Sequence, residues 1–280
     1  MIKPSILRNT VFLLPMLAML AVLSCAVAEE FTMTDGQVMS STSYRRTGNN
    51  IMIKVTTPEG GAIEMGVPVT RITKASFPEP PELAKARTAA ESANASEVLS
   101  LTGDYVSRNG DYKDIPGSWW PQMAQLRLLA LASADKDADA ANLARETGAI
   151  NNPSAESLAR GGALFGSLPS KDTEAVVVGA KSLTRVGGDQ GSALAQIALG
   201  RALLLKKDYT GALRAFLTVK VFYPSLAILQ PPALMGAAQA YIGLKDEKRA
   251  ALSLKQILET YPSSPQVPQA KKMSELLPKT

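Results

Sequence analysis

ALAQIALGRALLLKKDYTGALRAFLTVKVFYP, residues 193–224, and PPALMGAAQAYIGLKDEKRAALSLKQILETYP, residues 231–262, repeat each other. Apolar residues of similar size recur at the same places, and the matching pairs are Gly200 and Ala238, Leu203 and Tyr241, Ala212 and Ala250, Phe216 and Leu254, and Val219 and Ile257. Small residues such as Gly200 and Ala212 let two helices approach closely, large ones fill the seam, and the proline of each closing Tyr-Pro pair ends a helix. The two stretches therefore predict consecutive helical hairpins.

The segment Asp208-Tyr209-Thr210-Gly211-Ala212-Leu213 follows the turn between the two helices of a tetratricopeptide repeat (TPR), and the whole pattern resembles that family. The resemblance is specific for residues 193–262 and weaker for residues 122–189. It implies about four helical hairpins between residues 122 and 262, and a capping helix near Gln266 to Leu277. The expected fold class is mainly α, an α-solenoid of TPR-like helical hairpins.

Residues 83–280 are expected to form one helical repeat domain, because a further helix pair is predicted upstream, at residues 82–92 and 95–108. The loop after this pair carries the chain's two tryptophans, Trp119 and Trp120. Tandem aromatic residues could anchor a partner. Since large aromatic side chains dominate core burial, we expect instead that they seat one hairpin on the next.

The first 28 residues read as a signal peptide, with a charged start, an apolar run over residues 11–23 and a small-residue cleavage site that ends at Ala28. The protein is therefore expected to be exported to the periplasm. Residues 22–25 also resemble a bacterial lipoprotein box, in which Cys25 would be lipidated and the chain anchored at the outer membrane. Cleavage after Ala28 is the prediction and lipidation of Cys25 the alternative. Membrane contact is expected only through such a lipid.

Residues 29–77 have the composition of a small β module. Turn signals at residues 34–36, 47–50 and 58–61 separate short alternating runs, which predict four or five strands, the last over Val69 to Ala75. The layout resembles a small SH3-like or Sm-like barrel. Such a piece is marginal alone, so it is expected to dock on the helices or to self-associate. Residues 78–82 follow as a stiff Pro-rich linker.

Composition argues against several classes of function. The chain has no histidine, which removes Ser-His and Cys-His nucleophilic systems and most zinc sites. Its formal net charge of +5 is small and dispersed, so no nucleic-acid partner is expected. The carboxylates of Asp104, Asp111 and Asp114 are interpreted as solvated surface groups. We therefore expect no enzyme, no cofactor and no catalytic residue.

The run Asp135-Lys136-Asp137-Ala138-Asp139, with Glu146 at the twelfth position, copies the ligand spacing of an EF-hand loop. The sixth position needs glycine, however, and is Ala140 here. Asp139 is therefore interpreted as a helix cap that adds negative charge at the start of a helix, with a calcium site as the alternative. No metal is expected.

A binding groove is implied by the TPR resemblance, because the first helix of each hairpin in that family lines a concave surface. Carried over by register, the groove positions are Leu194, Ile197, Arg201 and Leu204 in one hairpin and Met235, Gln239 and Ile242 in the next. A mostly apolar floor with Arg201 and Gln239 suits an amphipathic helix or an extended peptide. Alternatively, the aliphatic positions serve as core.

Together these features predict a non-enzymatic adaptor of the bacterial cell envelope that binds another envelope protein or peptide through the groove. The alternative is a structural protein that self-assembles into a homo-oligomer through its N-terminal β module.

Overall fold

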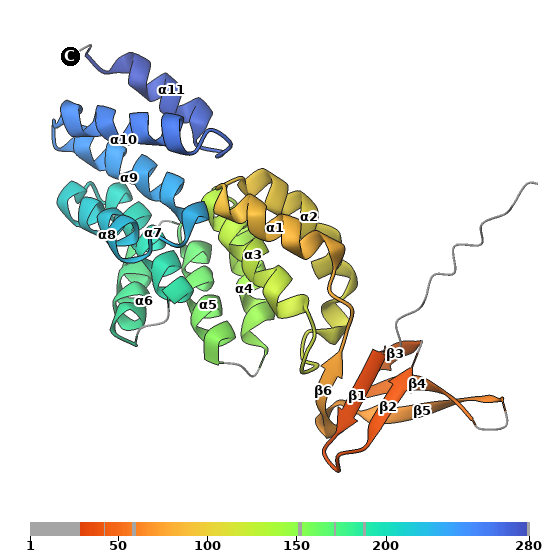
Figure 1. Ribbon diagram of the computed structural model, residues 1–280. Helices are drawn as coiled ribbons and strands as arrows, with labels where there is room; N and C mark the ends of the chain where they lie inside the picture. The colour runs from red at the N-terminus through yellow and green to blue at the C-terminus, as the bar shows by residue number, and fades with distance from the viewer. Residues whose placement is uncertain are drawn as a thin grey trace, which may run out of the picture.

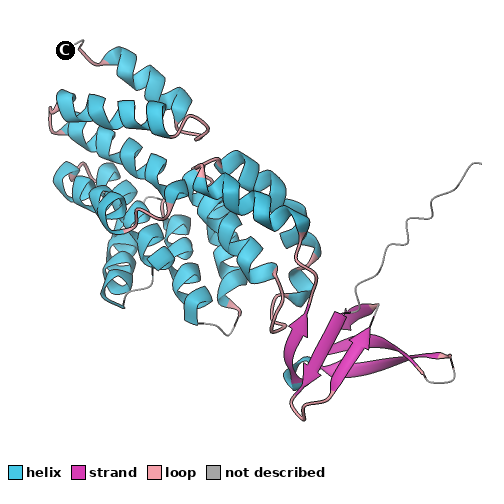
Figure 2. Cartoon of the chain, in the orientation of Figure 1, coloured by secondary structure: helices cyan, strands magenta, loops and turns pink. Residues whose placement is uncertain are grey.

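The computed structural model describes residues 29–41, 43–57, 60–150, 153–170, 172–186 and 189–278. These residues form a mainly helical chain with a small antiparallel β region at the N-terminal end (Figures 1 and 2). The predicted signal peptide and the lipidation candidate Cys25 lie outside the described residues.

The β region consists of two three-stranded antiparallel sheets, with strand orders β2-β1-β6 and β3-β4-β5. The strands are β1 (Glu29–Met33), β2 (Val38–Ser41), β3 (Tyr44–Thr47), β4 (Asn50–Thr56), β5 (Ala62–Pro68) and β6 (Ile72–Ser76). The turns predicted near Gly36 and Gly48 are confirmed, with both glycines at positive φ. The expected last strand begins three residues late, because Val69–Arg71 forms a short 3₁₀ turn (η1).

The helical part contains eleven α-helices among the described residues. They are α1 (Pro81–Glu91), α2 (Ala95–Arg108), α3 (Trp120–Ser133), α4 (Asp137–Gly148), α5 (Pro153–Ala163), α6 (Thr173–Val186), α7 (Asp189–Leu205), α8 (Tyr209–Phe222), α9 (Gln230–Gly243), α10 (Glu247–Thr260) and α11 (Val267–Leu276), with 3₁₀ turns η2 (Gly110–Tyr112), η3 (Leu164–Ser167) and η4 (Ala227–Leu229). The expected upstream pair appears as α1 and α2, and the expected capping helix as α11. Three of the four hairpins expected between residues 122 and 262 appear as α3–α4, α7–α8 and α9–α10. The fourth differs, because η3 separates α5 from α6 and these helices pack mainly on their other neighbours, α5 on α4 and α7 and α6 on α7.

The same turn joins the helices of four hairpins. In each, one residue takes a left-handed conformation with φ between 56° and 61°, and the next residue's N–H bonds to a carbonyl five residues back; the left-handed residues are Ala93, Asp135, Lys207 and Lys245. In three of these turns an Asn or Asp side chain then caps the second helix, namely Asn94, Asp208 and Asp246. The exception is Lys136, which caps α4 without a side-chain bond.

Phe216 of α8 shows why small residues recur at the helix seams. Its ring is 1% exposed and lies against Gly200 of α7 and Gly236 of α9. A Cβ atom built on Gly200 would come within 2.6 Å of the ring, and one on Gly236 would come closer still. The predicted close approach at Gly200 is confirmed, because only glycine leaves room for the phenyl ring there.

The array also makes contacts between segments far apart in sequence. The turn η4 packs on α3 and α1, and Gln266, just before α11, donates from Nε2 to the carbonyl of Ser133 at 2.6 Å. Figure 1 shows the N-terminal end of α9 close to α1 and α3. The C-terminal helices therefore pack back on the first ones.

The β region and the helices share a core. Ile115, in the loop between η2 and α3, is 2% exposed and packs with Phe31, Ile51 and Ile53 of the sheets. Tyr112 adds an edge-to-face contact with Tyr44 at 5.2 Å between ring centroids. The β region, expected to dock on the helices or to self-associate, thus docks through a loop that completes its own core.

Hydrogen bonds fix this loop against the β region. The Ala75 N–H donates to the Pro116 carbonyl at 2.7 Å, and Arg46 donates to the Asp111 carbonyl and to the Asp114 carboxylate. We call residues Gly110 to Ser118 the docking loop. Asp114 was expected to be a solvated surface group, and it instead joins the two parts of the chain.

The tryptophans support the same junction. Trp120 is fully buried and its Nε1 donates to the Val106 carbonyl at 2.9 Å, whereas Trp119 is half-buried and its Nε1 donates to the Phe77 carbonyl at 3.0 Å. The prediction that the pair packs rather than protrudes is therefore confirmed for Trp120. Trp119 ties Phe77, at the end of the β region, to the start of α3.

Replacing Gly117 with alanine should loosen the docking loop. Gly117 has φ +96°, and a Cβ atom there would overlap the Ala75 carbonyl. We expect a loss of about 2 kcal/mol or more in unfolding free energy, from strain and a displaced backbone. Urea denaturation measures it. The matched control is Gly110→Ala in the same loop, where a Cβ meets nothing within 4 Å; equal effects of the two changes would contradict the prediction.

Candidate functional site

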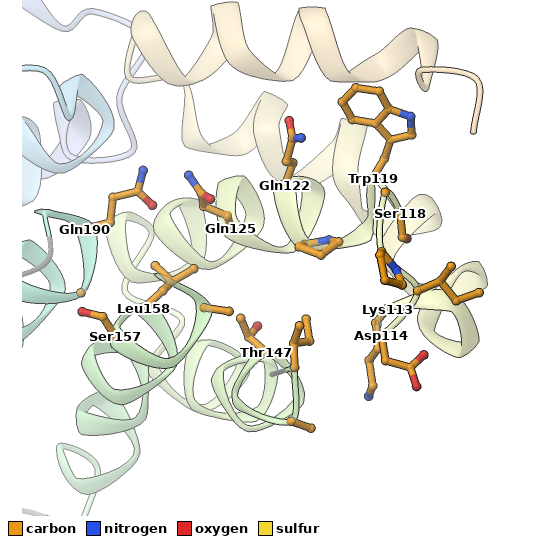
Figure 3. Close-up of a pocket in the computed structure, with 18 residues that line it drawn as sticks. Lys113, Asp114, Ser118, Trp119, Gln122, Gln125, Thr147, Ser157, Leu158 and Gln190 are labelled. Atoms are coloured by element: carbon orange, nitrogen blue, oxygen red, sulfur yellow. The ribbon is translucent and has the colours of Figure 1, made fainter. Parts of the chain in front are cut away.

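A groove of about 1060 Å³ lies beside the docking loop. We call it the large groove. Figure 3 shows its lining side chains, with Lys113 and Asp114 at one end and Gln190 and Ser157 at the other. The lining residues are Lys113, Asp114, Ile115, Pro116, Gly117, Ser118, Trp119, Pro121, Gln122, Gln125, Thr147, Ala149, Ile150, Ala155, Ser157, Leu158, Gln190 and Gly191.

Five parts of the chain build this groove. The docking loop forms one wall, and the first turns of α3 continue it through Gln122 and Gln125. The end of α4, the start of α5 and the first residues of α7 form the rest, where Gly191 lies directly against the Ser157 carbonyl and leaves no space for a Cβ. The groove therefore depends on the seating of the docking loop in the β region.

The lining is almost uncharged. Asp114 and Lys113 are the charged lining residues, and Arg46 lowers the pKa of Asp114, first by donating a hydrogen bond to its carboxylate. Lys113 Nζ lies 5.7 Å from the centre of the Trp120 ring. The side-chain amides of Gln125 and Gln190 make no hydrogen bond to any described residue. The groove thus offers amide donors and acceptors among apolar side chains.

The predicted groove residues divide into three sets. Leu194 and Ile197 are fully buried, so a partner can reach neither. They agree with the alternative interpretation, in which the aliphatic positions serve as core. Ile242 is 38% exposed and lines no cavity described here. The others surround two smaller hollows of about 410 and 210 Å³, which share Arg201 and Gln239; Leu204 lines the first and Met235 the second.

Arg201 is held within the protein. Its Nη1 donates to Asp137 at 2.7 Å, its Nη2 donates to the Ala132 carbonyl at 2.8 Å, and it also pairs with Asp135. Its guanidinium carbon lies 5.3 Å from the centre of the Phe165 ring. Arg201 lines both smaller hollows, and its guanidinium is also bound by the α3–α4 turn, so its role in partner binding stays a prediction.

The same ion pairs revise the interpretation of the acidic run. Asp135 and Asp137 bind Arg201, and Lys136, not Asp139, is the residue at the cap of α4. Asp139 lies within the first turn, where its charge still favours the helix start. Among the described residues, no group of three His, Cys, Asp or Glu side chains could hold a metal ion.

Burial shifts the pKa of Asp137 more than its ion pair with Arg201 does. Desolvation raises the pKa of Asp137 above its usual value of 3.8, and the positive charge of Arg201 opposes this shift. The ionised carboxylate therefore depends on Arg201 to remain in this partly buried position.

Sequence reasoning missed the large groove as a site. Its lining comes from segments that are up to 78 residues apart, from Lys113 to Gly191, so no local pattern unites them. The available signal was the irregular run of Pro, Gly and Trp between residues 115 and 121, which lines one side. The sequence analysis favours packing for the tryptophans of this run over a contact with a partner.

Comparison with known proteins gives no family assignment. No protein-family model matches the chain, and no similar sequence is found among curated proteins. Within the described residues, no helix is both long enough and apolar enough to span a bilayer.

Replacing Arg201 with methionine should destabilise the fold at neutral pH. The change leaves Asp137 partly buried without its partner, and we expect a loss of about 2–3 kcal/mol, below the ~3–5 kcal/mol of a fully buried pair. The pKa of Asp137 is higher in the folded protein than the value of 3.8 in the unfolded chain. Ionisation of this carboxyl therefore lowers the free energy of unfolding at high pH, and this penalty disappears when the pH falls below 3.8, where the carboxyl is protonated in both states.

The loss of unfolding free energy in the Arg201→Met protein should therefore become smaller as the pH falls from 7 toward 4. Urea denaturation at several pH values measures it. Arg249→Met is the control, since Arg249 also pairs with an aspartate and stacks on a ring but is largely exposed. A pH-independent loss, or an equal loss in the control, would contradict the assignment.

Proposed function

We propose that the protein is a non-enzymatic adaptor of the bacterial cell envelope that binds an extended segment of a partner protein in the large groove. The observation that carries the proposal is the size of this groove together with its nearly uncharged lining of amide and apolar side chains. We propose the large groove in place of the groove expected from the TPR resemblance, in which Arg201 is already bound by Asp135 and Asp137 of the same chain.

The chemistry of the lining favours a polypeptide over a small charged substrate. Gln125 and Gln190 can each donate to a main-chain carbonyl and accept from a main-chain N–H. Ile150 and Leu158 offer apolar contacts for alternate side chains, as extended peptides require. The carboxylate of Asp114 is engaged by Arg46, so no free acid-base pair is at hand for catalysis.

Two further features support the wider assignment. The four equivalent helix turns and the glycines around Phe216 fit an α-solenoid of TPR-like hairpins. The apolar leader of residues 1–28 fits export to the periplasm, with Cys25 as the candidate for a lipid anchor. On this proposal the β region is a small barrel-like module that holds the docking loop in place.

Filling the groove should block partner binding. Gln125→Trp places a large ring beside Gln122 and Pro121, and we expect at least a tenfold loss of affinity, about 1.4 kcal/mol. The partner is first captured from the native envelope by photo-crosslinking at position 190 and identified by mass spectrometry. Binding of the purified partner to each variant is then measured by calorimetry.

Gln256→Trp on α10 is the matched control, because Gln256 is also half-buried on a helix but lies outside the groove. Circular dichroism first checks that both variants are folded. If the Gln125→Trp protein then binds the partner with unchanged affinity, the large groove is not the binding surface.

A second candidate function, self-assembly through the β region, is favoured by strand β5. Among the described residues β5 pairs only with β4, so one edge of a seven-residue strand is open. Ile63 and Met65 lie on the core face with Ile53 and Val67, yet they are 50% and 42% exposed. Such an edge is a template for pairing with another chain.

The sequence of β5 is compatible with antiparallel pairing to a second copy. A two-fold axis at Met65 places Glu64 opposite Gly66 of the other copy and Ile63 opposite Val67. An axis at Glu64 would place two carboxylates opposite each other, which is destabilising. Of these two registers the one centred on Met65 is therefore favoured, and it places the exposed Ile63 and Met65 side chains beside apolar residues of the other copy.

Ile63→Lys should abolish this assembly. A lysine on an edge strand opposes strand addition at little cost to the fold, since Ile63 is half exposed. Analytical ultracentrifugation of the full chain should show a shift from dimer to monomer in this variant but not in Val178→Lys, which changes an exposed apolar residue of α6. A monomeric parent chain at high concentration would exclude the second function.

A further inference from the structure

Helices α8 and α10 lie side by side and expose one side of each helix to solvent. They are the second helices of consecutive hairpins, and Lys220 of α8 donates from Nζ to Oε1 of Gln256 on α10 at 3.0 Å. Figure 1 shows both helices at the end of the helical array far from the β region. We call the exposed residues of α8 and α10 the outer face.

Three large apolar side chains of the outer face are exposed. Val221 is 64%, Phe222 is 73% and Leu252 is 59% exposed, and none of them belongs to a core cluster of the described residues. Removing apolar surface from water is favourable in proportion to its area. These side chains therefore leave apolar surface for a contact outside the fold.

The outer face also carries more positive than negative charge. Its exposed cations are Arg214, Lys220, Lys248, Arg249 and Lys255, and its exposed carboxylates are Glu247 and Glu259. Asp246, at the cap of α10, pairs with Arg249, and Glu259 pairs with Lys255 at 3.7 Å. The other three cations make no ion pair with any described residue, so their charges are open to an external anion.

The positive charge is local to this end of the chain. Residues 209–278 hold eight Lys or Arg against four Asp or Glu, whereas residues 81–186 hold eleven against thirteen. An anionic surface is therefore attracted to the end of the array that bears the outer face, and not to the helices next to the β region.

The kind of cation and the shape of the outer face favour a lipid surface over a protein partner. Lysine, which is depleted in protein–protein interfaces, supplies three of the five cations. The cavities described above include no residue of the face, so none of them offers an adjoining pocket for an anchoring side chain. An anionic bilayer offers negative headgroups and apolar chains beneath them, and it needs no matching shape.

We propose that the outer face binds peripherally to the surface of an anionic lipid bilayer. Arg214, Lys220 and Lys248 lie at the level of the headgroups, and Phe222 and Leu252 reach into the apolar layer below. The folded chain makes this contact itself, in addition to any lipid attached to Cys25. The proposal is independent of the function assigned to the large groove.

Sedimentation with lipid vesicles tests the proposal. The chain from residue 29 is used, because it contains every described element and lacks the apolar leader. The vesicles contain either phosphatidylcholine alone or phosphatidylcholine and phosphatidylglycerol in equal amounts. We expect about tenfold tighter binding to the vesicles with the anionic lipid, and weaker binding in added salt, since salt screens exposed charges.

A single fluorescent label identifies the face that touches the lipid. Cys25 is the only cysteine of the sequence, so Phe222→Cys in the chain from residue 29 carries one thiol. A nitrobenzoxadiazole dye on this thiol should become brighter when anionic vesicles are added, because it enters an apolar layer. The same dye on Val38→Cys, at a residue of β2 that is 55% exposed, should not respond.

Charge variants measure the electrostatic contribution. The double change Arg214→Gln and Lys248→Gln should weaken binding to the anionic vesicles about tenfold or more, because each cation near the surface contributes about a factor of five. Lys54→Gln with Lys74→Gln is the matched control in the β region, where both lysines are also exposed and make no ion pair with a described residue.

Three results would overturn the proposal. They are equal or absent binding to the two kinds of vesicle, a dye response at position 38 but not at position 222, and equal effects of the two double changes. The first result would point to an acidic protein as the occupant of the outer face.

Discussion

The insertion of Ile115 into the β region is the interaction on which the arrangement of this protein depends. It fills a core that the strands of residues 29–77 do not close by themselves, and Arg46 and Ala75 hold the loop on both sides of it. The outer surface of the same loop is a wall of the large groove. Packing in the β region and shape of the groove are thus set by one segment.

A second constraint comes from Arg201, which binds the one of the four equivalent turns that lacks a side-chain cap. Three hairpins fix their turn with a capping Asn or Asp, whereas the α3–α4 turn uses its acidic residues to hold α7. A turn that lacks the capping side chain found in its equivalents often has another role in the protein. Here that role is to fasten two hairpins to each other and to leave hollows on either side of the guanidinium.

Local patterns explain most of what could be predicted. The approximate bounds of α1, α2 and α11, the turn at residues 208–213 and the close approach at Gly200 each follow from a few neighbouring residues. The apolar spacing that marks Leu194 and Ile197 as one helix face cannot distinguish a groove floor from a core, and they proved to be core. Contacts such as Arg201 with Asp137, which are 64 residues apart, need the complete array.

The docking loop also has a consequence for the order of folding. A chain emerges with its N-terminus first, so the strands up to Ser76 appear before the residue that completes their core. Contacts that span long stretches of sequence form slowly, because the loop between them must first be closed. Helices α1 and α2 lie within that loop and can form early from local contacts. The β region, although first in the sequence, should therefore reach its native packing only after they have formed.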